Sequence, residues 1–336
     1  MTLLPGLINS TLLYALCLVV VALGGMFTER SGTINIGLEG TMIVGATFGA
    51  LTIRAFNMNG FGEVAGQWAV LIAVLVAALS GCIYSMLLAF ASIHMKADQT
   101  IGGTALNIFA PAFCYLLVSS IQSEFSSAGS TTVLFNYDWV TFNLGFSEEF
   151  RNSFFGILLF KGFAITTPIA ILIWIISTIV LYKTRFGLRL MSCGEHPQAA
   201  ASAGIGVYTT RYIGVGLSGL LAGFGGIMWA FIATSGVAPG AGVAGFGFLA
   251  LAVMIFGNWK PQNILGAALI FAFFNALGKY SSGIDFLPSF SNLAQGTGDS
   301  IYKMLPYIVT LVVLAFTSKK SRAPKMEGIP YDKGAR

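Results

Sequence analysis

The sequence predicts an all-α fold, a bundle of about eight to ten helices that cross a lipid bilayer. Apolar residues make up 56% of the 336 residues, and charged residues only 9%. A soluble domain carries roughly a quarter of charged residues, so a bilayer must solvate most of this chain. The arrangement of the apolar residues in long runs supports the same class.

Apolar runs near the length of a bilayer span recur along the chain. They cover residues 6–27, 35–54, 67–91, 99–121, 161–182, 212–234, 245–257, 261–280 and 300–317. The first run lacks the basic residues that begin a signal peptide and is too long for its apolar core, so we expect it to remain as a span. The second run is broken by glycines and the seventh is short, which makes re-entrant or broken helices an alternative at both.

The basic residues predict which loops face the cytoplasm. Four basic residues flank or lie in the polar loop 183–211 against one acid, Glu195, and the tail 319–336 carries six against Glu327 and Asp332. Cytoplasmic loops are enriched in Lys and Arg, so we place both segments inside, and the four predicted spans between them agree. The acidic loop at about 122–160 is then external. The chain therefore divides into a transmembrane domain, 1–318, and a basic cytoplasmic tail, 319–336.

Several function classes are excluded by missing motifs. The net charge of +5 comes from loops that topology explains, so no nucleic-acid partner is expected. The chain has neither GxxxxGK[ST] nor HExxH, and its four cysteines lack metal-ligand spacing. The sequence predicts no metal and no cofactor, and any ATP hydrolysis would belong to another chain.

A short surface helix is predicted inside the polar loop. Pro197 suits the first turn of a helix, Gly204 suits the left-handed residue beyond its end, and the residues between them are rich in alanine. Such a helix is about 10 Å long, too short to cross a bilayer. We interpret it as a docking element for a cytosolic partner.

Polar residues within the apolar runs are the candidates for a transport path. A carboxylate at Glu39 is costly in a span, so it either lines a path or gate, or caps a helix N-terminus at the interface. Asn35 is expected to satisfy exposed backbone groups of the same turn. Thr104 and Asn107 share a helix face, where they could bind a polar solute or bond neighbouring helices.

Glycine pairs predict close helix packing. Gly45 and Gly49 are spaced as GxxxG, and so are Gly219 and Gly223. Small residues at this spacing let helices approach closely in membranes.

Five motifs in order along the chain carry a resemblance to a known family. They are ERSGTINIGLEG at 29–40, QTIGGTALN at 99–107, GEHPQAA at 194–200 with AGI at 203–205, GFGF at 245–248, and LPY at 305–307. Together they resemble permease subunits of bacterial ABC importers, from the group that serves branched-chain amino acids, monosaccharides and nucleosides. Within this group they look most similar to simple-sugar and nucleoside permeases, particularly those for purine nucleosides.

The resemblance implies partners, a site and a location. The partners are cytosolic ABC ATPase subunits, a second homologous permease, an external solute-binding lipoprotein and a nucleoside or sugar substrate, with the chain in the bacterial cell membrane. Residues 194–205 would be the coupling helix received by the ATPase. The residues that carry this role are Gly194, Glu195, His196, Pro197, Ala199, Ala200 and Gly204. His196 stands where the group commonly has Asn, which puts the chemistry of the helix N-cap in doubt.

Two rival classes fit the sequence less well. A secondary transporter driven by an ion gradient usually needs buried carboxylates, and apart from Glu39 and Asp299 the spans hold almost none. An enzyme acting inside the membrane would need a nucleophile and base or a set of metal ligands, and the sequence indicates neither.

Overall fold

Six long apolar helices dominate the computed structural model of the chain. The residues it describes are 3–61, 66–123, 133–134, 165–233, 236–238, 242–280, 304–305, 307–309, 311–312 and 322–334. Among these residues, six helices are long and apolar enough to cross a membrane. They are α1 (Leu3–Arg30), α4 (Gln67–Ala89, continued by the π-helical turn η1, Phe90–His94), α5 (Gln99–Ser123), α8 (Thr166–Lys183), α11 (Val207–Ala233) and α13 (Pro261–Tyr280). The predicted all-α membrane bundle is confirmed.

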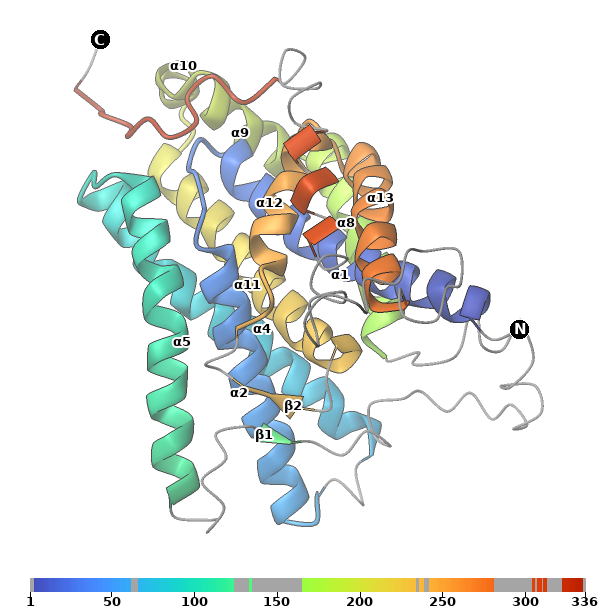
Figure 1. Ribbon diagram of the computed structural model, residues 1–336. Helices are drawn as coiled ribbons and strands as arrows, with labels where there is room; N and C mark the ends of the chain where they lie inside the picture. The colour runs from blue at the N-terminus through green and yellow to red at the C-terminus, as the bar shows by residue number, and fades with distance from the viewer. Residues whose placement is uncertain are drawn as a thin grey trace.

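Two further helices begin inside the bundle. Helix α2 (Leu38–Met58) follows a non-helical stretch after α1, and the short α12 (Phe246–Phe256) occupies the seventh predicted run. Figure 1 shows the chain leaving the end of α1 and running into the body of the bundle before α2 starts. Each helix therefore has its N-terminus among other helices, as expected of a broken span.

A two-stranded sheet joins distant parts of the chain. Strand β1 (Val133–Leu134) pairs antiparallel with β2 (Gly236–Val237), with Val133 opposite Val237. Most of the loop 122–160 that we predict to be external lies outside the described residues.

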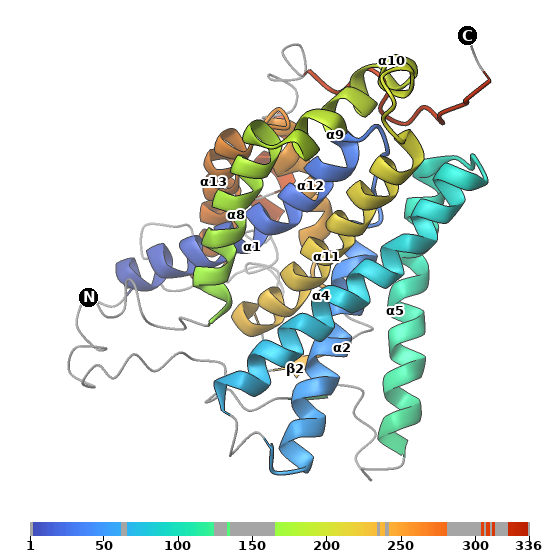
Figure 2. The ribbon, with the colours of Figure 1, turned by 180° about the vertical axis from the view of Figure 1, so that it is seen from behind.

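Helices α1 and α11 form the centre of the bundle. Both are mostly buried, and α11 packs against α4, α1 and α2. Helix α5 packs mainly on α2 and stands at one edge, whereas α8 and α13 stand at the other (Figures 1 and 2). The exposed side chains of α5 and α8 are largely apolar, as in a protein surrounded by lipid.

Glycines set the spacing of the central helices. A Cβ added to Gly45 of α2 would lie 2.4 Å from the Cα of Gly223 of α11, and one added to Gly81 of α4 would lie 2.4 Å from the carbonyl oxygen of Gly219. Real Cβ contacts are never this close, so backbone packs on backbone at these crossings. Both predicted glycine pairs thus have a member at a close helix contact.

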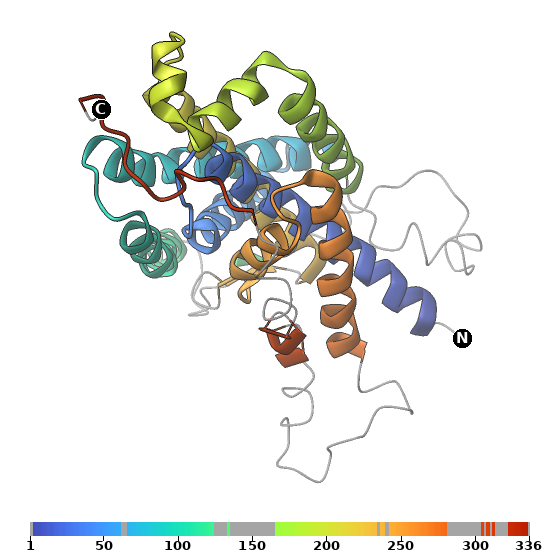
Figure 3. The ribbon, with the colours of Figure 1, turned by 90° about the horizontal axis from the view of Figure 1, so that it is seen from above.

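The polar loop after α8 forms two helices at one end of the bundle. Helix α9 (Arg185–Glu195) buries Gly187, Leu190 and Cys193 on one face, and α10 (Pro197–Ser202) follows it directly. The segment Arg322–Gly334 crosses the same end of the molecule, seen from above in Figure 3. We call the surface formed by α9, α10, residues 90–98 and this segment the α10 face.

Candidate functional site

Helix α10 has defined ends that follow from its sequence. Pro197 occupies the first helical position, where its missing N–H breaks no hydrogen bond. Gly204 has a φ of +79°, and its N–H donates to the carbonyl of Ala201 at 3.0 Å, while that of Ile205 donates to the carbonyl of Ala200 at 3.0 Å. This is the Schellman arrangement that closes a helix. At the other end the side chain of His196 makes no capping bond.

The proposed coupling residues divide into an outer and an inner set. His196, Ala199 and Gly204 are exposed, and Glu195 is half-buried. Gly194, Pro197 and Ala200 are buried, which the sequence pattern did not indicate. The outer set is free to meet a partner, and the inner set holds α10 on the bundle.

Contacts with other parts of the chain explain the burial of Gly194 and Ala200. A Cβ on Gly194 would lie 2.4 Å from the carbonyl oxygen of Arg30, so the backbone at the end of α9 lies directly against the end of α1. Ala200 packs in a small cluster with Cys193 of α9, Val207 of α11 and Tyr331 of the C-terminal segment. Burial raises the pKa of the Cys193 thiol, which keeps it neutral in this apolar cluster.

The second candidate site lies where α2 and α12 begin. Glu39, in the first turn of α2, is 8% exposed. Its Oε1 accepts a hydrogen bond from the backbone N–H of Gly245 at 2.9 Å, and its Oε2 accepts one from Gly247 at 2.6 Å. The carboxylate therefore caps α12 while it lies in the positive N-terminal turn of α2.

Asparagine and glutamine side chains bind the non-helical backbone before α2. The Oδ1 of Asn35 accepts from the Gly37 N–H at 3.0 Å, and its Nδ2 donates to the Ser218 Oγ at 2.9 Å. The Oε1 of Gln99 accepts from the Ile34 N–H at 2.6 Å. In a bilayer, backbone outside a helix must find such partners within the protein.

Asn107 ties α5 to the same region. Its Oδ1 accepts from the Gly40 N–H at 2.8 Å and its Nδ2 donates to the Ile36 carbonyl at 2.9 Å. Thr104 does not join it, because its side chain is exposed and its hydroxyl bonds carbonyl oxygens of its own helix. The structure thus groups Asn35, Glu39 and Asn107 around the start of α2 and leaves Thr104 on the outer surface of α5.

Two residues of this region were missed by sequence reasoning. Ser218 lies in the apolar α11 and belongs to none of the sequence motifs. Tyr307 donates its hydroxyl to the carbonyl of Ala244 at 2.8 Å, just before α12. The only signal for Tyr307 was its place in the LPY motif, and nothing local to Ser218 indicated its role.

Comparison with known proteins identifies the family. The profile of the branched-chain amino acid transport system permease component matches residues 7–314. The guanosine ABC transporter permease protein NupQ of Bacillus subtilis is 38% identical over 331 residues, which cover 98% of this chain and 97% of that protein. The nucleoside ABC transporter permease protein NupC of Lactococcus lactis is 36% identical over 330 residues, 97% of this chain and 96% of that protein.

A second Lactococcus permease shares a shorter region. The nucleoside ABC transporter permease protein NupB is 33% identical over 104 residues, 31% of this chain and 29% of that protein. No solved structure matches the chain. With the family profile covering most of its length, this multi-pass membrane protein is a transport subunit rather than an enzyme, and it belongs to the family of branched-chain amino acid transport system permease components.

Proposed function

We propose that this chain is the permease subunit of an ABC importer for nucleosides, and that separate ATPase subunits drive it through α10. The observation that supports this best is the near full-length similarity to two permeases whose names specify guanosine and nucleoside transport. The resemblance of the sequence motifs to purine nucleoside permeases agrees. We also propose an external solute-binding lipoprotein and a second, homologous permease as partners, and NupB supplies a precedent for a related second permease.

Helix α10 is proposed to transmit the ATPase movement. Ala199 of α10 is exposed, as are His196 and Gly204 beside its two ends, and the helix leads within a few residues into α11 at the centre of the bundle. A partner that binds one conformation of this surface more tightly than another shifts the equilibrium between them. We place the α10 face and the C-terminal segment in the cytoplasm, which agrees with their basic composition.

The proposed path runs past the start of α2. Glu39, Asn35 and Asn107 hold the backbone of the two broken helices, so they would shape the path by fixing its wall. Thr104 presents a hydroxyl on the outer surface of α5, where it would meet a solute only if a second permease closes the path there.

A bulky substitution on the outer surface of α10 tests the coupling role. We expect Ala199→Trp to prevent co-purification of the ATPase subunits and to abolish nucleoside uptake in proteoliposomes, because the indole occupies the docking surface. Ala55→Trp is the matched control, since Ala55 is exposed on α2, away from the α10 face. Wild-type assembly and uptake in Ala199→Trp would show that α10 does not dock the ATPase.

Competition assays test the substrate class. Uptake of labelled guanosine by the assembled transporter should fall with excess unlabelled purine nucleosides and persist with excess ribose or leucine. Inhibition by ribose or leucine alone would instead assign the transporter to the sugar or amino-acid branch of the group. Uptake by the chain without ATPase subunits, driven by a proton gradient, would contradict the ABC mechanism altogether.

A further inference from the structure

The C-terminal segment Arg322–Gly334 lies beyond the family match, which ends at residue 314, yet it is anchored across the α10 face. The backbone N–H of Met326 donates to the carbonyl of Gly194 at 2.9 Å, at the end of α9. The N–H of Arg322 donates to Asn258 Oδ1 at 2.8 Å, in the turn between α12 and α13. The segment therefore connects elements that are far apart in the sequence.

A buried arginine holds the middle of the segment. Arg211 of α11 is 1% exposed, and its Nη1 donates to the carbonyl of Ile329 at 2.9 Å. We expected Arg211 to be one of the basic residues flanking the polar loop, but the structure buries it beneath the segment. A buried guanidinium is costly unless it has acceptors, so the Ile329 carbonyl is part of its solvation.

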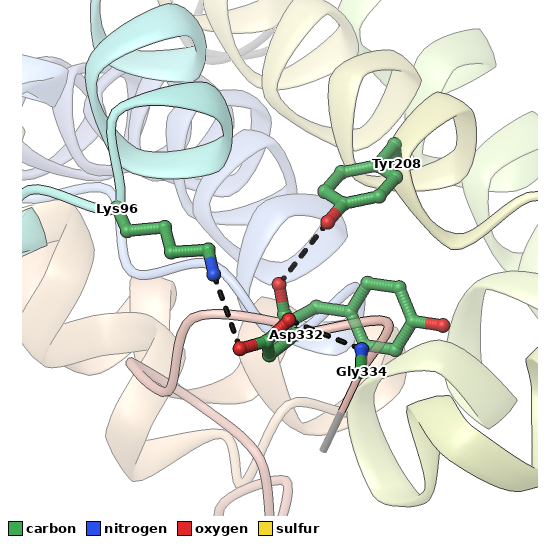
Figure 4. Close-up of polar contacts among 5 residues, drawn as sticks. Lys96, Tyr208, Asp332 and Gly334 are labelled. Carbon is green, nitrogen blue, oxygen red and sulfur yellow. Dashed lines mark hydrogen bonds and ion pairs between the residues drawn. The ribbon is translucent and has the colours of Figure 1, made fainter.

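The end of the segment meets the turn between α4 and α5. The Lys96 Nζ lies 3.2 Å from Asp332 Oδ2, and the Tyr208 hydroxyl donates to the Tyr331 carbonyl at 3.4 Å (Figure 4). The Gly334 N–H donates to the Asp332 carboxylate at 3.2 Å, which orients that carboxylate. Two prolines, at 324 and 330, restrict the backbone and reduce the entropy lost when the segment docks.

Tyr331 is the large residue of the cluster that supports α10. Its side chain is 6% exposed and packs with Cys193, Ala200 and Val207, all of them smaller. A helix of six residues is unstable by itself, so its position depends on tertiary contacts. Without the tyrosine ring, the cluster would keep only Cys193, Ala200 and Val207 as fully buried members, with Ile205 and Tyr208 partly buried against it.

We propose that residues 324–332 form a strap that fixes α10 to α9, α11 and the α4–α5 turn, with Tyr331 as the positioning residue for the coupling helix. The proposal rests on the proposed docking of ATPase subunits at α10. If α10 could move independently of the bundle, the ATPase movement would not be transmitted to the membrane helices. A strapped α10 passes that movement to several helices together.

The test uses the complete transporter in proteoliposomes and compares three variants. Tyr331→Ala should lower nucleoside uptake per ATP hydrolysed by about tenfold, a typical size for coupling between sites, while the ATPase subunits still hydrolyse ATP. Tyr331→Phe should behave as wild type, because the segment uses the ring and the backbone carbonyl of this residue. Ile329→Ala is the matched control, since that side chain is 46% exposed on the same segment.

Hydrogen exchange separates positioning from loss of the fold. In Tyr331→Ala, the amides of 198–202 should exchange faster while those of α13 remain protected. Equal loss of protection in both regions, or wild-type uptake per ATP in Tyr331→Ala, would overturn the strap proposal. If Ala199→Trp leaves transport intact, the docking proposal fails, and the exchange data still report whether the strap holds α10.

Discussion

The Oε2 atom of Glu39 accepts a hydrogen bond from the backbone N–H of Gly247 at 2.6 Å, which joins the N-terminal turns of α2 and α12. The two residues are 208 positions apart. A Cβ on Gly247 would lie 2.5 Å from the Glu39 Cα, so only glycine permits the carboxylate and the helix end to meet. Two interruptions in separate apolar runs thus become one junction.

Removal of the Glu39 carboxylate should weaken this junction. Glu39→Ala leaves the N–H groups of Gly245 and Gly247 without their acceptors, at a cost of about 1–3 kcal/mol for each buried donor. We expect a lower melting temperature of the purified transporter and reduced uptake. Glu39→Gln should be intermediate, because it retains one acceptor oxygen.

Thr104→Ala is the control for that experiment. Its hydroxyl bonds only carbonyl groups of α5 among the described contacts, so the melting temperature should not change. An unchanged melting temperature in Glu39→Ala would mean that the carboxylate does not hold α12. If Thr104→Ala reduces uptake without a change in melting temperature, the hydroxyl belongs to the path.

Gly223→Ala should strain the centre of the bundle. The added methyl group would lie 2.3 Å from the carbonyl oxygen of Ala77 and close to Gly81, so α11 and α4 must separate. Overpacking of this kind typically costs about 1–3 kcal/mol, and we expect a lower melting temperature in detergent. Gly266→Ala in α13 is the matched control, because nothing lies within 4 Å of its added methyl group. Equal effects of the two substitutions would exclude close packing as the cause.

The strap should dock less firmly as pH rises through the titration of Glu327. Burial raises the pKa of the Glu327 carboxyl, and its hydrogen bond with Glu29 at the end of α1 offsets part of that rise. The docked form binds the proton more tightly than the undocked form. Docking therefore keeps its full free energy below the ordinary glutamate pKa of about 4.3, and it becomes weaker as pH rises through the raised pKa. Glu327→Gln should therefore protect the amides of 325–329 and 331 more than wild type at neutral pH. This difference in protection between variant and wild type should disappear in acid. A difference that grows in acid would show that the Glu327 carboxyl does not weaken docking at neutral pH.

Asp332 should show the opposite dependence. The Gly334 N–H and the Lys96 ammonium lower the pKa of the Asp332 carboxyl, so its contribution is present above the ordinary aspartate pKa of about 3.9 and is lost as pH falls through the lowered pKa. Both side chains of the ion pair are exposed, so the effect should be small and screened by salt. Asp332→Asn should loosen residues 332–334 at low salt, measured by hydrogen exchange. The same loosening at about 1 M salt would show that charge is not its cause.

The sequence alone determined the class of the protein and contained the local signals for its membrane helices and for the ends of α10. Runs of apolar residues specify membrane helices whatever their neighbours, because the bilayer acts on each helix separately. Pro197 and Gly204 mark the ends of α10 for similarly local reasons, through a missing N–H and a left-handed backbone. The motifs of the chain were sufficient for the resemblance to nucleoside permeases.

Only the tertiary structure decided which polar groups meet. Glu39 could have lined a path or capped a helix, and its pairing with Gly245 and Gly247 depends on how α2 and α12 fold back toward each other. The C-terminal segment is polar and rich in proline and glycine, so no periodicity indicated that Tyr331 packs beneath α10. Contacts between residues more than a hundred positions apart depend on the arrangement of the helices, and local residue preferences do not specify that arrangement.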